Sequence, residues 1–122
     1  MNVGPKPNGE LPIEQEGLLR EIALWHMANE EAIHNTRPWI VTNEANIWFT
    51  KNKDENTVYA FLTKVPDWSR GQRKEFVLSS VKATENTKLD VLGQSSQWVE
   101  YQPNADATCR FEQKEDGVHV SV

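Results

Sequence analysis

The chain has 122 residues, and its 18 acidic side chains outnumber its 13 lysines and arginines, which gives a formal net charge of -5. This length suffices for one domain with a modest core, and the acidic balance argues against a nucleic-acid partner. No apolar run approaches the roughly 20 residues that span a bilayer, so no membrane partner is predicted.

The first segment is rich in proline and glycine. Pro5, Pro7 and Gly9 cannot share a regular element, so residues 4–11 are predicted to form a connection. Pro12 then fits the first position of a helix, where a missing N–H costs nothing. The prolines also exclude a phosphate-binding loop, because they remove backbone donors that such a loop needs.

One amphipathic helix is predicted after Pro12. Glu14 and Glu16 lie in its first turn, where the helix dipole favours negative charge. Apolar residues recur every three or four positions and should form one stripe, buried in the folded protein. The members of this stripe are Leu18, Leu19, Ile22, Trp25 and Ala32. Asn35 can adopt the left-handed conformation that closes a helix, and Pro38 prevents its continuation, so the chain leaves in an extended conformation.

After residue 39 the pattern changes from helical to alternating, which predicts strands. About seven short strands are expected, and their spacing is typical of an antiparallel β-sandwich. The predicted strands are residues 46–51, 57–65, 75–82, 88–92, 97–101, 107–113 and 118–122. Residues 52–56 should form a hairpin turn, and 115–117 another. The fold class is therefore mainly β, with one long N-terminal helix before the sandwich.

The titratable side chains form no recognisable catalytic or metal-binding motif. The acidic residues fall at predicted helix ends or in turns, where solvation and the helix dipole explain them. His26 and His34 lie eight positions apart, and His119 is on the wet face of a strand, so no zinc site is predicted. Cys109 is the only cysteine, which excludes an internal disulfide. Cys109 lies two residues before Phe111 in a predicted strand, so both side chains should point to the same face. This predicts a buried structural thiol.

Five tryptophans are many for a chain of this length. An exposed tryptophan can stack on the apolar face of a sugar ring. Most of the tryptophans are predicted to make core or interdomain contacts instead. These are Trp25, Trp39, Trp48 and Trp98. Trp68 lies in a predicted loop beside Arg70 and Arg73, which makes it the candidate for sugar contact.

Short motifs in the first third of the chain follow one another in a characteristic order. They are Asn2-Val3-Gly4-Pro5, Asn8-Gly9, Leu11-Pro12 with Gln15, the run from Trp25 to Ile33, and Thr36-Arg37-Pro38-Trp39. In order and spacing they resemble the end of the catalytic barrel in α-L-fucosidases of glycoside hydrolase family 29. Two departures are small: His34-Asn35 stands where the family commonly has Tyr-Gly, and Leu11 replaces the usual isoleucine.

The later sequence, from Val91-Leu92-Gly93-Gln94 onward, is similar to the β-sandwich that follows the barrel in this family. The resemblance implies that residues 1–39 are the last loop-helix unit of a catalytic barrel and residues 40–122 a C-terminal accessory sandwich. It also implies that the chain is trimmed at both ends. The structural motif residues carried over from the family are Asn2, Gly4, Pro5, Pro12, Trp25, Arg37, Pro38 and Trp39.

For the parent enzyme, the resemblance implies hydrolysis of terminal α-L-fucose from glycans with retention of configuration and without a metal or organic cofactor. Retaining glycosidases use two carboxyl groups about 5 to 5.5 Å apart. In the family both come from barrel strands that precede Asn2, so this chain has no predicted catalytic residue and is expected to be inactive alone. The expected partners are the barrel of the same parent chain and a fucosylated glycan. The implied location is periplasmic or secreted in a bacterium and lysosomal in a eukaryote.

Two alternatives stay open. The sandwich could be a carbohydrate-binding module that targets the enzyme to glycans through Trp68. Alternatively, the apolar stripe of the helix, around Leu18, Ile22 and Trp25, could pack against the sandwich or a second copy of the chain.

Overall fold

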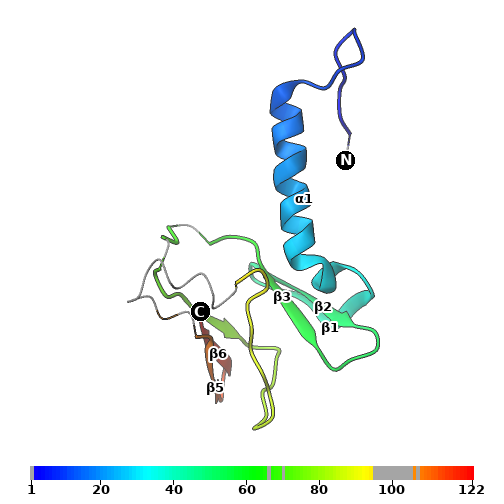
Figure 1. The fold of residues 1–122 in the computed structure, drawn as a ribbon. Coiled ribbons are helices and arrows are strands. Elements are labelled where there is room, and N and C mark those ends of the chain that lie inside the picture. The colour runs from blue at the N-terminus through cyan, green and yellow to red at the C-terminus, as the bar shows by residue number, and fades with distance from the viewer. Residues whose placement is uncertain (1, 66, 70, 95–105, 107) are drawn as a thin grey trace. The chain divides into compact units, whose positions relative to one another are not determined.

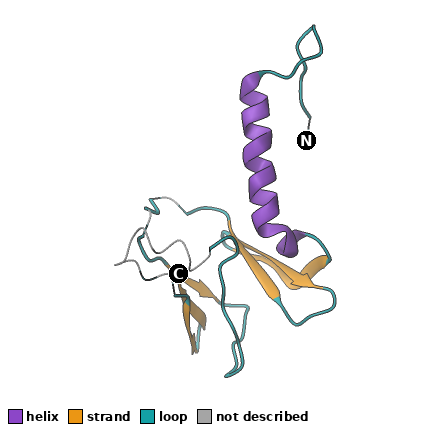
Figure 2. Ribbon diagram, viewed as in Figure 1, coloured by secondary structure: helices purple, strands orange, loops and turns teal. Residues whose placement is uncertain are grey.

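The computed structural model describes residues 2–65, 67–69, 71–94, 106 and 108–122. In this part of the chain one helix is followed by six strands, which form two antiparallel three-stranded sheets (Figures 1 and 2). The chain divides into two compact units, Met1–Glu30 and Glu31–Val122. The predicted fold class, a mainly β protein with one N-terminal helix, is confirmed.

The loop before the helix closes on itself through main-chain hydrogen bonds. The N–H of Lys6 donates to the carbonyl of Glu10 at 2.8 Å, and the N–H of Gly9 donates to the carbonyl of Lys6 at 2.9 Å. Gly9 has a φ of 85°, which glycine adopts without a steric penalty. The N–H of Gly4 donates to Oε1 of Gln15 at 3.0 Å, so the loop is also tied to the first turn of the helix.

The helix α1 spans Ile13–Ile33 and begins directly after Pro12, as predicted. Its regular geometry is interrupted at Asn29, where φ is -121° and ψ is 16°. The side-chain amide of Asn29 donates to the carbonyl of Trp25 at 2.8 Å. After the helix, Asn35 adopts a φ of 53°, which confirms its predicted role in ending the helix.

The first sheet contains β1 (Thr36–Glu44), β2 (Ile47–Asn52) and β3 (Val58–Leu62), in the order β1-β2-β3. The sequence predicted β2, β3 and their hairpin. It predicted the start of β1 only as an extended segment after the helix. Pro38 is tolerated in β1 because this is an edge strand, and the register against β2 shifts between Pro38 and Asn43. The hairpin turn is held by Oδ1 of Asn52, which accepts from the N–H groups of Asp54 at 2.9 Å and Glu55 at 3.1 Å.

The second sheet contains β4 (Glu75–Leu78), β5 (Arg110–Lys114) and β6 (Gly117–Ser121), in the order β4-β6-β5. The strand predicted at 88–92 is wrong: these residues form no strand, and Leu89 packs on the core from a loop. The alternating pattern of this segment includes the contact of Leu89 with the core, and the segment pairs with none of the six strands of the described residues. The strand predicted at 97–101 lies outside the described residues.

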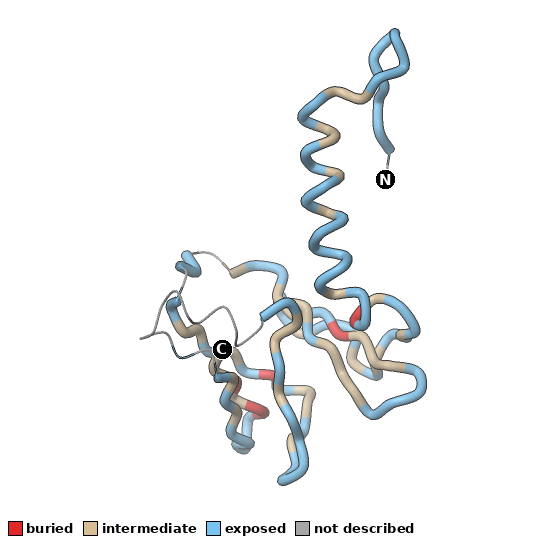
Figure 3. Tube along the Cα trace, viewed as in Figure 1, coloured by how far each residue is buried: buried red, intermediate tan, exposed pale blue. Residues whose placement is uncertain are grey.

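Both sheets contribute to one core. Phe49 of β2, Leu78 of β4, and Val118 and Val120 of β6 are at most 9% exposed (Figure 3). Val118 and Val120 alternate with His119 and thus form the inner face of β6. Trp39 packs on this core, with its ring centroid 5.4 Å from that of Phe49. Two sheets that share their inner faces are the arrangement of a β-sandwich.

A carboxylate joins the two sheets at their ends. Glu44, the last residue of β1, accepts hydrogen bonds from the N–H groups of Ser79 at 2.9 Å and Ser80 at 2.8 Å, and from the Ser80 hydroxyl. These residues follow β4, so β4 ends at Leu78 and does not continue to residue 82 as predicted. Among the described residues no helix has the length and apolar character that a membrane span requires.

Candidate functional site

Trp68, the predicted sugar-contact residue, lies in the connection between β3 and β4 and is 40% exposed. Its indole N–H donates to the carbonyl of Gln72 at 2.6 Å. The side chain of Gln72 in turn accepts from the N–H of Ser69 at 3.3 Å. The Trp68 ring also contacts Phe76, with ring centroids 5.9 Å apart. The indole is therefore held in one orientation, and it presents apolar ring surface, not its N–H, to a ligand.

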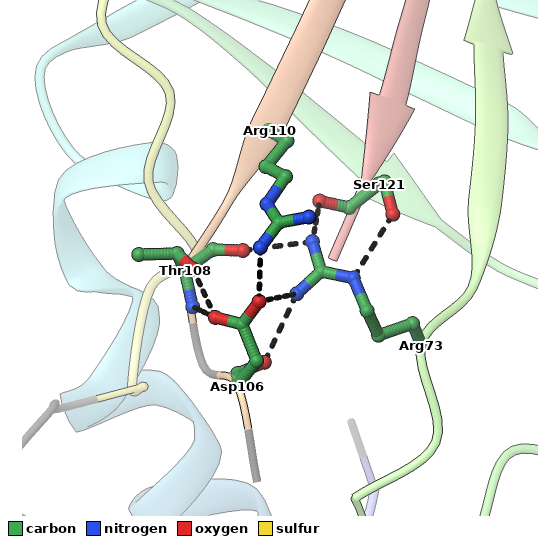
Figure 4. A network of polar contacts seen from close by, with 5 residues as sticks. All are labelled: Arg73, Asp106, Thr108, Arg110 and Ser121. Carbon is green, nitrogen blue, oxygen red and sulfur yellow. Dashed lines mark hydrogen bonds and ion pairs between the residues drawn. The ribbon is translucent and has the colours of Figure 1, made fainter.

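Of the two arginines near Trp68 in sequence, Arg73, which the structure describes, does not join it in a site. Arg70 lies outside the described residues. The Arg73 guanidinium is bound by other groups of the protein: Nε donates to Oγ of Ser121 at 3.2 Å, and Nη2 donates to the carbonyls of Ser121 at 2.9 Å and Thr108 at 2.8 Å (Figure 4). Nη1 donates to the Asp106 carbonyl at 3.0 Å. These bonds use its donors, so Arg73 is not available to bind a sugar hydroxyl.

Asp106 is the centre of this polar network. Its carboxylate accepts from the N–H of Thr108 at 3.0 Å and from the Thr108 hydroxyl. It also pairs with Arg110 and, at 3.5 Å, with Arg73. Hydrogen bonds from the Thr108 hydroxyl and N–H lower the pKa of Asp106. Burial opposes them to a lesser extent, and the charges of Arg110 and Arg73 add a smaller lowering effect. Sequence reasoning missed this cluster, because the partners of Arg73 lie 33 to 48 positions away along the chain.

A second carboxylate with a lowered pKa occurs in the turn between β5 and β6. Asp116 lies 2.8 Å from Nε2 of His119, and this hydrogen bond lowers its pKa. Both His26 and His34 are exposed on or just after α1. In the described part of the chain no three histidine, cysteine or acidic side chains are grouped as a metal site requires. Cys109 is only partly buried, so the prediction of a buried thiol is wrong; it precedes the exposed end of edge strand β5.

The predicted apolar stripe of α1 is mostly uncovered. Ala32 is buried and Leu19 and Ile22 are half-buried, whereas Leu18 is 56% and Trp25 49% exposed. The prediction that Trp25 lies on a buried face is therefore wrong for this chain. Among the residues of α1 that the structure describes, only Ala32, in the last turn, is buried.

The opposite side of α1 is apolar as well. Ile13, Leu24 and Met27 are 74%, 67% and 73% exposed. At about 100° of rotation per residue they lie on the side away from Ile22 and Trp25. A helix that is apolar on several sides is normally buried in a larger structure. Its surface is thus typical of a helix with protein neighbours on more than one side.

Comparison with known proteins gives this surface a context. No family model matches the chain. It is 40% identical over 68 residues to the α-L-fucosidase of Dictyostelium discoideum, which covers 55% of this chain and 15% of that protein. It is 30% identical over 107 residues to the plasma α-L-fucosidase of Homo sapiens, which covers 85% of this chain and 22% of that protein. The matched segments lie in the C-terminal parts of these proteins.

The chain is homologous to the C-terminal part of α-L-fucosidases. The resemblance seen in the sequence motifs is thereby confirmed. A third relative, the plasma α-L-fucosidase of Rattus norvegicus, is 30% identical over 96 residues, 76% of this chain and 20% of that protein. The chain thus spans less than a quarter of the length of the α-L-fucosidases that it matches.

The motif residues named by the resemblance form two groups that flank α1, while Trp25 lies within the helix. Gly4 and Gln15 meet through the hydrogen bond that ties the loop to the start of α1, while Asn2 and Pro5 are exposed in that loop. The other group forms the first half of β1, where Trp39 contacts the core and Arg37 is exposed. Both groups therefore shape the ends of α1.

Proposed function

We propose that this chain is the C-terminal, non-catalytic portion of a retaining α-L-fucosidase that removes terminal α-L-fucose from glycans. Residues 1–39 would be the last loop-helix unit of its catalytic barrel, and residues 40–122 its accessory sandwich. The observation that carries the proposal is the match to the C-terminal parts of α-L-fucosidases, over as much as 85% of this chain. The role of the chain is then to complete and support the barrel.

The carboxylates of the chain support a non-catalytic role. A retaining glycosidase needs a nucleophile and a general acid about 5 to 5.5 Å apart, and the acid works with a raised pKa. Among the described residues, Asp106 and Asp116 have shifted pKa values, and both pKa values are lowered. Each is held by hydrogen bonds from its own surroundings, which favours a permanently charged, structural carboxylate.

The surface of α1 supports the same assignment. Exposed apolar residues occur on two opposite sides of this helix, with Leu18 and Trp25 on one side and Leu24 and Met27 on the other. A helix at the wall of a barrel has strands on one side and neighbouring helices on the other. The portion of α-L-fucosidases that precedes the matched segment supplies enough chain for such neighbours.

The proposal is tested with two proteins and one assay. The 122-residue chain should release no aryl alcohol from an aryl α-L-fucoside above the buffer rate. A chimera in which this chain replaces the matched C-terminal segment of human plasma α-L-fucosidase should hydrolyse the same substrate and give the α-anomer of fucose first, as seen by NMR. Hydrolysis by the purified chain alone would contradict the non-catalytic role.

A second candidate function is glycan binding at Trp68. It is favoured by the fixed orientation of the indole and its 40% exposure, which leave an apolar ring surface for a sugar. Titration of the chain with a fucosylated oligosaccharide should then change its tryptophan fluorescence, and Trp68→Ala should abolish the change. Trp48→Ala, which removes another exposed tryptophan, is the matched control. No response at millimolar sugar would exclude this function.

A further inference from the structure

The loop of residues 4–11 leads directly into α1, the helix that the proposed function assigns to a catalytic barrel. In such a barrel the loop before each helix leaves the carboxyl end of a strand, and these loops together build the catalytic face. The loop projects beyond the N-terminal end of α1 and belongs to the same compact unit (Figure 1). On the proposed function, the loop therefore lies at the catalytic face of the enzyme.

Hydrogen bonds and prolines hold this loop in one conformation. The N–H of Lys6 donates to the carbonyl of Glu10 at 2.8 Å. The side-chain amide of Asn8 donates to Oε2 of Glu10 at 2.8 Å, and its Oδ1 accepts from the N–H of Glu10 at 3.2 Å. Pro5 and Pro7 fix the backbone on both sides of Lys6. A loop held in this way loses little conformational entropy when it binds a ligand.

The Lys6 ammonium is the charged group of this loop that remains available to a ligand. The side chain is exposed, and the ammonium makes no hydrogen bond or ion pair with any residue that the structure describes. The carboxylate of Glu10, the other charged group of the loop, already accepts from Asn8. Lys6 can therefore donate hydrogen bonds to the hydroxyls of a sugar without breaking a contact within the chain.

The position of the cleaved bond indicates which sugar Lys6 would contact. The two carboxyl groups of a retaining glycosidase flank this bond. When the terminal fucose lies inside the pocket, the rest of the glycan, which is the leaving group, extends outward toward the rim. A loop at the rim of the catalytic face therefore faces the leaving group. Contacts to such a remote part of the substrate can lower the barrier to cleavage.

We infer that Lys6 is a specificity-determining residue that binds the leaving-group sugar of a fucosylated glycan, an inference that rests on the proposed function. The loop then contributes to substrate choice, although the chain supplies no catalytic carboxylate. The ligand is a neutral sugar bearing several hydroxyls, and the donor is the ammonium of Lys6.

The test compares two substrates of the chimera with human plasma α-L-fucosidase. The leaving group of fucosyllactose is a sugar, whereas that of an aryl α-L-fucoside is not. Lys6→Ala should lower kcat/KM about tenfold more for fucosyllactose than for the aryl fucoside, because a hydrogen bond from a charged donor is lost with one substrate only. Lys6→Arg keeps a charged donor and should hold the ratio of the two kcat/KM values within about threefold of that of the unsubstituted chimera.

Lys53→Ala is the matched control. Lys53 is an exposed lysine in the turn between β2 and β3, which the proposed function assigns to the accessory sandwich. This variant should leave the ratio within about twofold of the unsubstituted chimera. If Lys6→Ala lowers both kcat/KM values equally, or changes neither, in a chimera that hydrolyses the aryl fucoside, the role of Lys6 is overturned and the proposed function stands. If the unsubstituted chimera hydrolyses neither substrate, the proposed function fails, and the role of Lys6 fails with it.

Discussion

The backbone geometry at Gly117 leaves no room for a side chain. Its φ is 141°, and a Cβ at this position would lie 2.6 Å from the carbonyl oxygen of Leu78 and 2.7 Å from Cα of Ser79. Both neighbours are backbone and cannot turn aside as a side chain can. Gly117→Ala should therefore lower the free energy of unfolding by about 2 kcal/mol or more, measured by urea denaturation. Gly17→Ala, at an open position in α1, should instead raise helix stability by up to about 1 kcal/mol. If Gly117→Ala were as stable as the wild type, the close approach of the Leu78 and Ser79 backbone to this position would be contradicted.

The Asp106 network predicts a pH dependence of stability. Because the pKa of Asp106 is lowered in the folded chain, folding favours its charged form. Its stabilising contribution is present above the ordinary pKa of 3.8 and is lost as the pH falls through the lower pKa of the folded state. Asp106→Asn should thus lower the thermal midpoint at pH 6, and the difference from wild type should shrink as the pH approaches 3. Asp90→Asn, at another exposed aspartate, is the control and should have little effect at either pH. If the difference in thermal midpoint between Asp106→Asn and wild type grew as the pH fell, folding would not favour the charged form of Asp106.

Two adjacent residues of β2 show how a strand divides between core and surface. Phe49 is 3% exposed between the sheets, whereas Trp48 is 53% exposed on the opposite face of the strand. Phe49→Ala should lower the free energy of unfolding of the 122-residue chain by about 3 to 5 kcal/mol, because it leaves a cavity in the small core. Trp48→Ala should cost less than about 1 kcal/mol in the same protein. Equal losses, measured by the same urea titration, would contradict the face assignment.

The elements that sequence reasoning predicted well are those with local causes. Proline geometry at Pro12 and a left-handed conformation at Asn35 define the two ends of α1, and both signals lie within the segment itself. The start of β1 was missed because Pro38 reads as a breaker until β2 is known to lie beside it. Residues 88–92 have the alternation of a strand, but they pair with no strand in the described part of the chain. Pairing of this kind is decided by distant residues, which local patterns do not contain.

In the candidate site too, local features could be predicted from the sequence and long-range contacts could not. Trp68 could be placed in an exposed loop because Asp67 and Gly71 flank it with turn chemistry. The engagement of Arg73 could not be foreseen, since its partners Thr108 and Ser121 come from the other end of the chain. An arginine near a tryptophan in sequence therefore gives little evidence of a shared ligand.

At the scale of the whole molecule, the exposed sides of α1 predict association. Trp25 is 49% exposed on one side, and Leu24 and Met27 are 67% and 73% exposed on the other. Burial of apolar area contributes roughly 25 cal/mol per Å², so these side chains favour any protein surface that removes them from water. On the proposed function that surface is the rest of the enzyme; for the separate chain it is a second copy.

The separate chain should therefore dimerise or form larger species as its concentration rises, as measured by sedimentation velocity. Leu24→Lys combined with Met27→Lys should shift the population toward monomer, because charge in an apolar contact is costly to bury. Glu21→Gln, on the same helix, changes charge without changing apolar area and is the control. A chain that stays monomeric at every concentration, with its helix intact by circular dichroism, would show that these sides of α1 are stable in water. Their exposure would then no longer support a position within a larger enzyme, and the homology alone would carry that assignment.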